Sequence, residues 1–243
     1  MKTHAWLGAA AAGCLAVSLI SQPADAGSDI AAGTSSAQEH LGTVSFPVSC
    51  APAVQASFNR GVALLHDFWY EEARPQFERI LKQDPACSMA HWGIAMSLWH
   101  QLWNKPDEAT IQKGLAEMRA AQSPAAKTQR ERDYISAIGT FYNGSADHSH
   151  EQRAEAYSNA MEKIYLGYPK DREAVVFYAL SLLASEPDAD QDYANRKKAA
   201  AILEKLFAIE PDHPGVAHYL IHSYDKPEMA RLGLPAARRY AKI

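Results

Sequence analysis

The sequence predicts an all-α protein built as a solenoid of stacked helix pairs. From residue 54 onward apolar residues recur at helical spacing, and the two-residue alternation typical of a strand is absent. Prolines also divide the chain at a nearly regular interval of about 40 residues, which is typical of repeat proteins. These prolines are Pro85, Pro124, Pro169 and Pro211.

Two helices are predicted between successive prolines. The first pair covers residues 58–68 and 71–81, and Phe58, Val62 and Leu65 share one face of its first helix. The other predicted pairs are 88–103 with 107–121, 125–142 with 151–167, 171–185 with 190–208, and 215–224 with 228–242. Each pair has more apolar surface than it can bury alone, so stacking about five pairs would build the core.

Residues 1–26 have the pattern of a secretory signal peptide. Lys2 gives a basic start, and the apolar run Leu7 to Ile20 is shorter than the roughly 20 residues that span a bilayer. Ala24-Asp25-Ala26 then matches a cleavage signal, although a lipoprotein signal at Cys14 is the alternative. We expect export to the bacterial periplasm or the extracellular space, with no integral membrane segment in the mature chain.

The mature chain divides into two predicted parts. Residues 27–47 are rich in Gly, Ser, Ala and Thr, which predicts a flexible N-terminal segment. Residues 48–243 form the helical repeat domain. Its last helix lacks the polar cap repeat that solenoids need, so we expect a truncated chain, or a partner or a second copy covering that end.

Composition narrows the function classes. Apolar residues make up 47% of the chain and charged residues 21%, as in ordinary soluble globular proteins. The net charge of −4 disfavours nucleic-acid binding, which usually needs a basic face. The sequence also lacks a nucleophile elbow, a phosphate-binding loop and a haem-attachment motif, so we predict neither an enzyme nor a cofactor.

The first helix pair carries the residues of a known repeat. Gly61, Ala73, Phe77 and Pro85 follow one another at intervals of 12, 4 and 8 residues. In this pattern the sequence resembles a tetratricopeptide repeat, in which small residues let two helices cross, the aromatic residue fills the crossing and the proline ends the second helix. The resemblance implies a right-handed solenoid with a concave groove lined by the first helix of each pair.

Later segments extend the resemblance over residues 46–243. The phrases CSMAHWGIAM, YANRKKAAAILEKLF and HPGVAHYLIHSYDKPEMARLGLPAARRYA are similar to a group of exported bacterial tetratricopeptide proteins. Members of that group usually continue with further repeats.

The resemblance places a set of candidate residues in the groove, near a cluster of tryptophans and histidines. These candidates are Phe58, Val62, Leu65, His66, Trp69 and Trp103. An aromatic, histidine-bearing groove would suit a peptide or a partner helix, because aromatic side chains dominate binding hot spots. The alternative is that the large aromatic side chains pack between helices.

His218 and His222 are weak candidates for a metal site. They are four residues apart on a predicted helix, so they share one face, and such spacing can hold zinc or copper. Two histidines supply only half of a site. The alternative is that each imidazole bonds a neighbouring helix, so the sequence alone assigns no metal.

Cys50 and Cys87 are predicted to form a disulfide. Each precedes or opens the first helix of a pair, and the same ends of stacked pairs are neighbours. An oxidising compartment favours the bridge. The alternative is two separate buried thiols.

The function predicted from these observations is a scaffold that binds a protein or peptide partner in its concave groove. One alternative is a metal- or small-ligand-binding protein built on the histidine and tryptophan cluster. Another is a structural component of a cell-envelope assembly.

Overall fold

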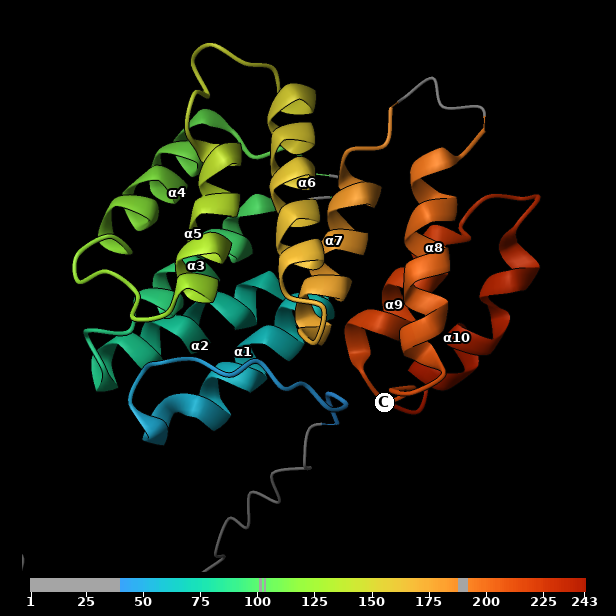
Figure 1. Cartoon of the computed structure of the whole chain (residues 1–243), viewed down its shortest axis with the longest axis horizontal. Helices are drawn as coiled ribbons and strands as arrows, with labels where there is room; N and C mark the ends of the chain where they lie inside the picture. The colour runs from blue at the N-terminus through green and yellow to red at the C-terminus, as the bar shows by residue number, and fades with distance from the viewer. Residues whose placement is uncertain (1–39, 101, 103, 188–191) are drawn as a thin grey trace, which may run out of the picture. The chain divides into compact units, whose positions relative to one another are not determined.

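The computed structural model describes residues 40–100, 102, 104–187 and 192–243. In this part of the chain it contains ten α-helices, two short 3-10 helices and no β-strand (Figure 1). The α-helices are α1 (Gln55–His66), α2 (Tyr70–Gln83), α3 (Ser88–Trp99), α4 (Glu108–Ala120), α5 (Gln129–Tyr142), α6 (His150–Gly167), α7 (Arg172–Ala184), α8 (Ala194–Phe207), α9 (Pro214–Ser223) and α10 (Leu234–Tyr240).

Consecutive helices pack against each other in pairs along the chain, from α1 with α2 to α9 with α10. The predicted all-α fold of packed helix pairs is therefore confirmed, while the handedness of the solenoid stays a prediction. The last helix is shorter than predicted, because residues Ala230–Gly233 form a 3-10 turn ahead of α10.

The residues of the first repeat form a close crossing around one aromatic ring. Phe77 of α2 is fully buried between α1 and α3. A Cβ atom placed on Gly61 would lie 2.7 Å from the Phe77 ring, and one on Gly93 would lie 2.4 Å from it. The two glycines therefore let α1 and α3 reach the ring from two sides. The sequence motif predicted the crossing at Gly61.

Local capping residues fix the starts of the middle helices. The Thr128 hydroxyl accepts the backbone N–H of Glu131, and the Glu131 carboxylate accepts the N–H of Thr128, which starts α5. Ser149 and Gln152 form the same reciprocal pair at the start of α6.

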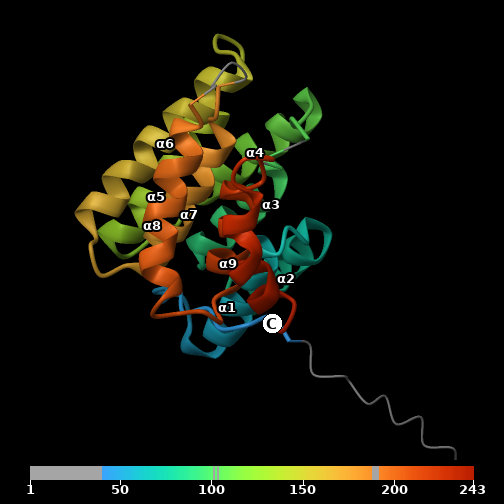
Figure 2. The ribbon, with the colours of Figure 1, turned by 90° about the vertical axis from the view of Figure 1, so that its right-hand side faces the viewer.

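The first helix contacts the fifth pair as well as the second. α1 packs against α3 and also against α9, and Figure 2 shows α9 beside α1. The approach is close, since a Cβ atom on Gly215 of α9 would lie 2.6 Å from His66 Nδ1. The first helices of the pairs, which are α1, α3, α5, α7 and α9 and are called the inner helices here, therefore pack on one another, and their side chains form the core.

A segment before the first helix, residues 40–51, completes this core and is called the strap here (Figure 1). Phe46 is fully buried in the strap. Its ring centre lies 5.5 Å from that of Phe58, 5.3 Å from Trp92, 5.0 Å from Tyr134 and 6.4 Å from Phe177. One side chain of the strap thus contacts residues from α1, α3, α5 and α7.

The ordered strap differs from the flexible segment predicted over residues 27–47. Hydrogen bonds hold it, because the Thr43 N–H donates to the Asp212 carbonyl at 2.9 Å and the Gln55 amide donates to the Phe46 carbonyl at 2.9 Å. Residues 27–39 lie outside the described part of the chain. The composition of the strap resembles that of a linker, but the single aromatic residue Phe46 anchors it.

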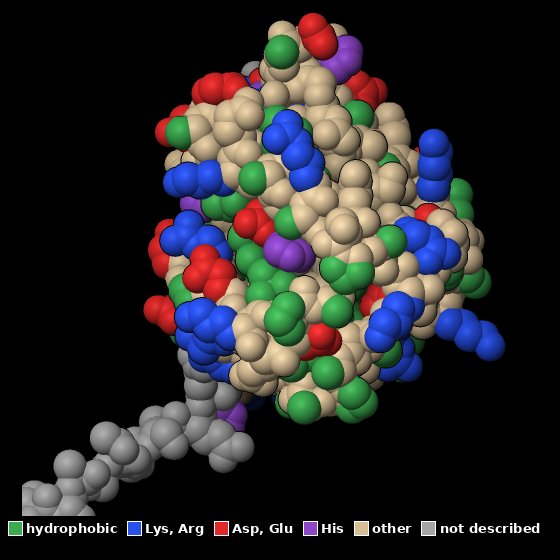
Figure 3. Space-filling model, turned by 90° about the vertical axis from the view of Figure 1, so that its left-hand side faces the viewer, with side chains coloured by type: hydrophobic (Ala, Val, Ile, Leu, Met, Phe, Trp, Pro, Cys, Tyr) green, Lys and Arg blue, Asp and Glu red, His purple; other side chains and the backbone are tan. Residues whose placement is uncertain are grey.

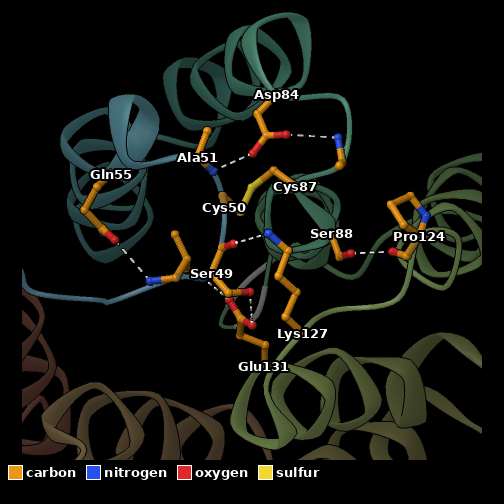
Figure 4. Close-up of a disulfide and its surroundings, with 12 residues drawn as sticks. Ser49, Cys50, Ala51, Gln55, Asp84, Cys87, Ser88, Pro124, Lys127 and Glu131 are labelled. Carbon is orange, nitrogen blue, oxygen red and sulfur yellow. Dashed lines mark hydrogen bonds between the residues drawn. A yellow bond between two sulfur atoms is a disulfide. The ribbon is translucent and has the colours of Figure 1, made fainter.

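A disulfide joins the strap to α3, as predicted (Figure 4). The sulfur atoms of Cys50 and Cys87 are 2.06 Å apart. Beside the bridge, the N–H and hydroxyl of Ser49 each donate to the Glu131 carboxylate at 2.5 Å. The strap is therefore fastened to the starts of α3 and α5.

The outer surface carries charges of both signs. On the face in Figure 3, Lys and Arg side chains lie among Asp and Glu side chains, with hydrophobic groups between them. Each helix in the described part of the chain is too short or too polar to cross a lipid bilayer.

Candidate functional site

The structure buries four of the six predicted groove residues. Phe58, Val62 and His66 are fully buried, and Leu65 is 3% exposed. They face the other inner helices instead of an open groove, because the contact between α1 and α9 closes the face on which they lie. These four side chains therefore belong to the core and are not accessible to a partner.

The two remaining groove candidates are tryptophans. Trp69 precedes α2 and is 50% exposed, but it lines neither of the two cavities described below. Trp103 lies outside the described residues. Trp92 and Trp99 are fully buried, which matches the packing interpretation of the tryptophan cluster.

A cavity of about 750 Å³ lies where α7 and α9 end, and is called the end cavity here. The starts of α6 and α8 and the segment after α3 complete its wall. Its lining is mainly polar, and includes His100, Asn104, Asn159, Asn195, Lys198 and His222. From this set, His222 was a candidate metal ligand in the sequence, and His100 belongs to the cluster of tryptophans and histidines noted there.

Two exposed ion pairs lie in the wall of the end cavity. Lys198 Nζ lies 2.8 Å from Glu162 Oε1, and Lys105 pairs with Glu151. These four side chains are between 40% and 63% exposed. Exposed pairs contribute about 0–1 kcal/mol each, so a charged ligand can replace one partner at little cost.

A second cavity of about 860 Å³ lies at the other end of the inner helices, between the strap and the starts of α5 and α7. Several of its charged groups bond to one another or to the strap. Arg130 Nε lies 2.5 Å from Asp171 Oδ2, the Arg130 guanidinium lies over the Phe46 ring, and Glu131 accepts from Ser49. These groups hold the strap in place, so we assign this cavity a structural role.

A buried hydrogen-bonded network joins α1, α7 and the start of α9. Glu173 Oε2 lies 2.9 Å from His66 Nε2, and Glu173 Oε1 lies 3.0 Å from His213 Nε2. Each side chain is at most 3% exposed. Burial alone would raise the pKa of the Glu173 carboxyl, but His213 and His66 hold that pKa at about 2. The carboxyl is therefore ionised in the core.

Two histidines and a carboxylate also have the composition of a metal site, and their ligand atoms lie within 4.8 Å of one another. The position of the proton on the His213 imidazole argues against metal binding. His213 Nδ1 accepts the backbone N–H of Val216 at 3.4 Å, so the neutral ring carries its proton on Nε2 and donates it to Glu173. A metal would need Nε2 without that proton. We therefore interpret the network as a structural tie.

His218 and His222 lie together on α9, as their spacing predicted. Their Nε2 atoms are 3.1 Å apart. Burial lowers the pKa of the His218 imidazole to about 4 and also lowers the pKa of His222. Both rings are therefore neutral near pH 7. The pair is half-buried, and His222 forms part of the wall of the end cavity.

Sequence reasoning missed Glu173 and the role of His213. The network joins residues from three helix pairs, and no local spacing connects them. Glu173 stands in the first turn of a helix, where an acidic residue is ordinary. The asparagines of the end cavity likewise stand on separate helices and share no motif.

Comparison with protein-family models, with curated proteins and with solved structures finds no match for this chain. The resemblance to tetratricopeptide proteins therefore stays a prediction that rests on the residues quoted above.

Proposed function

We propose that this protein is an exported binding protein that holds an extended segment of a protein or peptide partner in the end cavity. The observation that carries the proposal is the cavity itself, with a volume of about 750 Å³ and a wall built from several helices. A volume of this size is typical of specific ligand sites. The proposal moves the binding surface away from α1, whose predicted groove residues are buried.

The polar lining suits a peptide backbone. Asn104 and Asn159 are exposed in the cavity wall, and each amide offers both donors and an acceptor. An extended peptide presents the same two kinds of group along its length. The amides can therefore pair with a bound main chain without requiring one particular sequence.

The charged residues of the wall add selectivity. Lys198 and Lys105 each form an ion pair with an exposed carboxylate, so an acidic side chain of the ligand can compete for either ammonium group. Glu162 and Glu151 offer the same exchange to a basic side chain. A segment with both charge signs would satisfy the cavity best.

Export is part of the proposal. The disulfide between Cys50 and Cys87 supports it, because such bonds persist in oxidising compartments such as the periplasm.

The test begins with a displayed peptide library selected against the purified protein. Enriched peptides are then measured by fluorescence anisotropy against two variants of α6. Asn159→Trp places an indole in the cavity, whereas Lys163→Trp places one on an exposed position of the same helix outside the cavity wall. We expect at least tenfold weaker binding to Asn159→Trp and unchanged binding to Lys163→Trp.

Both variants should keep the unfolding midpoint of the unmodified protein, which excludes misfolding as the cause. Failure of any peptide to enrich, or equal binding by the two variants, would contradict the proposal.

A further inference from the structure

The two histidines of α9 have converging ring nitrogens. His218 and His222 stand one helical turn apart, and their Nε2 atoms are 3.1 Å apart. Two nitrogens that each lie about 2.0–2.1 Å from one metal ion, at right or tetrahedral angles, stand roughly 2.9–3.4 Å apart. The observed separation therefore fits two ligands of a single ion.

The opposite nitrogen of His218 has the partner that a metal ligand needs. His218 Nδ1 lies 2.6 Å from the carbonyl oxygen of His66, and a carbonyl can only accept a hydrogen bond. The neutral ring must therefore carry its proton on Nδ1, which leaves the lone pair on Nε2. A backbone carbonyl in this position is a common second partner of metal-binding histidines.

Without a metal ion, a hydrogen bond joins the two rings. Because His218 Nε2 carries no proton, His222 Nε2 donates to it across 3.1 Å. A cation that binds both nitrogens replaces this proton, and the His222 ring then carries its proton on Nδ1. Asp225 Oδ2 lies 4.0 Å from His222 Nδ1, and its negative charge favours a proton on that side of the ring.

Neighbouring rings hold this arrangement. The Phe68 ring centre lies 4.4 Å from that of His218 and 5.6 Å from that of His222, stacked on the latter. Tyr240 stacks on His218 at 4.9 Å. Because these contacts restrict rotation of the imidazoles, little rotational entropy would be lost when an ion binds.

We propose that His218 and His222 bind one divalent transition-metal ion of the zinc or copper class. Imidazole nitrogens favour these ions over magnesium and calcium, which prefer oxygen ligands. His222 forms part of the wall of the end cavity, so water or a ligand in the cavity completes the coordination. The site therefore places a Lewis acid at the edge of the end cavity.

Isothermal titration calorimetry with Zn²⁺ tests the site, using the purified protein freed of metal by chelation. We expect saturable binding of one ion per chain. His222→Gln should weaken the affinity at least tenfold, because it removes one of the two nitrogen ligands. His91→Gln is the control, since His91 pairs with Glu117 outside the end cavity.

A second readout identifies the ligand atoms. Electron paramagnetic resonance of the Cu²⁺-loaded protein should show hyperfine coupling to two imidazole nitrogens, and His222→Gln should remove one of them. Absence of saturable Zn²⁺ binding, or equal affinity of His222→Gln and the unmodified protein, would overturn the proposal. These results do not depend on whether a peptide binds the cavity.

Discussion

The imidazole of His218 donates from Nδ1 to the backbone carbonyl of His66 at 2.6 Å, and this bond joins α9 to α1. A second bond links the same helices, because His66 Nδ1 lies 2.9 Å from the Tyr219 hydroxyl. Through these contacts the fifth helix pair is fastened to the first. The inner faces of the pairs therefore become a core, and ligand access is left to the ends of the inner helices.

Replacing Glu173 with Gln should destabilise the protein by about 3–5 kcal/mol. The substitution removes the charge on which two buried histidines converge, and an amide cannot accept from both of them. Urea unfolding followed by circular dichroism measures the change. Glu117→Gln is the matched control, because the pair between Glu117 and His91 is partly exposed and should contribute about 1 kcal/mol or less. Equal effects of the two substitutions would contradict the structural role of the network.

Stability should fall as the pH is lowered from 7 to 4. The folded pKa of His218 is about 4 against 6.5 for an ordinary histidine, and that of Glu173 is about 2 against 4.5. Both groups bind more protons in the unfolded chain, so acid favours unfolding. The pKa shift of His218 alone contributes about 3 kcal/mol to the free energy of unfolding, and this contribution is lost as the pH falls from 6.5 to 4.

Urea unfolding at a series of pH values measures this dependence. His218→Gln should show a smaller slope of unfolding free energy between pH 6.5 and 4.5, whatever its absolute stability. If the free energy of unfolding of the unmodified protein did not change over that pH range, the imidazole of His218 would not be buried in its neutral form.

Gly93→Ala should destabilise the crossing of α2 and α3. A Cβ atom there would lie 2.4 Å from the buried Phe77 ring, and overpacking of this kind costs about 1–3 kcal/mol. Gly167→Ala is the control at the end of α6, where a Cβ atom meets nothing within 4 Å and should be neutral or slightly stabilising. Thermal unfolding compares the two variants, and a stabilised Gly93→Ala would exclude the close crossing.

Phe46→Ala should lower the free energy of unfolding by about 3–5 kcal/mol, although Phe46 lies outside any helix. Its ring is fully buried among aromatic side chains of α1, α3, α5 and α7, so truncation opens a cavity in the core. Ser45→Ala, at the exposed neighbouring position, should change stability little. Equal urea midpoints for the two variants would show that the strap contributes nothing to the core.

Much of the fold could be predicted because it depends on local patterns. Apolar spacing marks the helices, and prolines mark the stops between pairs. The intervals from Gly61 to Phe77 describe a crossing of neighbouring helices, which the structure contains. The disulfide between Cys50 and Cys87 could be predicted because the same ends of neighbouring helix pairs lie side by side.

The end cavity and the buried network depend on contacts between helix pairs that are far apart in the sequence, and no single motif encodes those contacts. The contact of α1 with α9 makes His66 a core residue, although its position in the first repeat predicts a groove residue. For the same reason no spacing indicates that Glu173 meets His66 and His213. By contrast, His218 and His222 lie on one helix, so their proximity was predictable.

Nuclear magnetic resonance of the labelled protein, titrated with a selected peptide, tests the central claim most directly. The side-chain amide signals of Asn104, Asn159 and Asn195 should shift, because these groups line the end cavity. The chemical shifts of Phe58 and Trp92 should not change, because both side chains are fully buried in the core. Shifts centred on Phe58 and Trp92, with unchanged asparagine amides, would contradict the account.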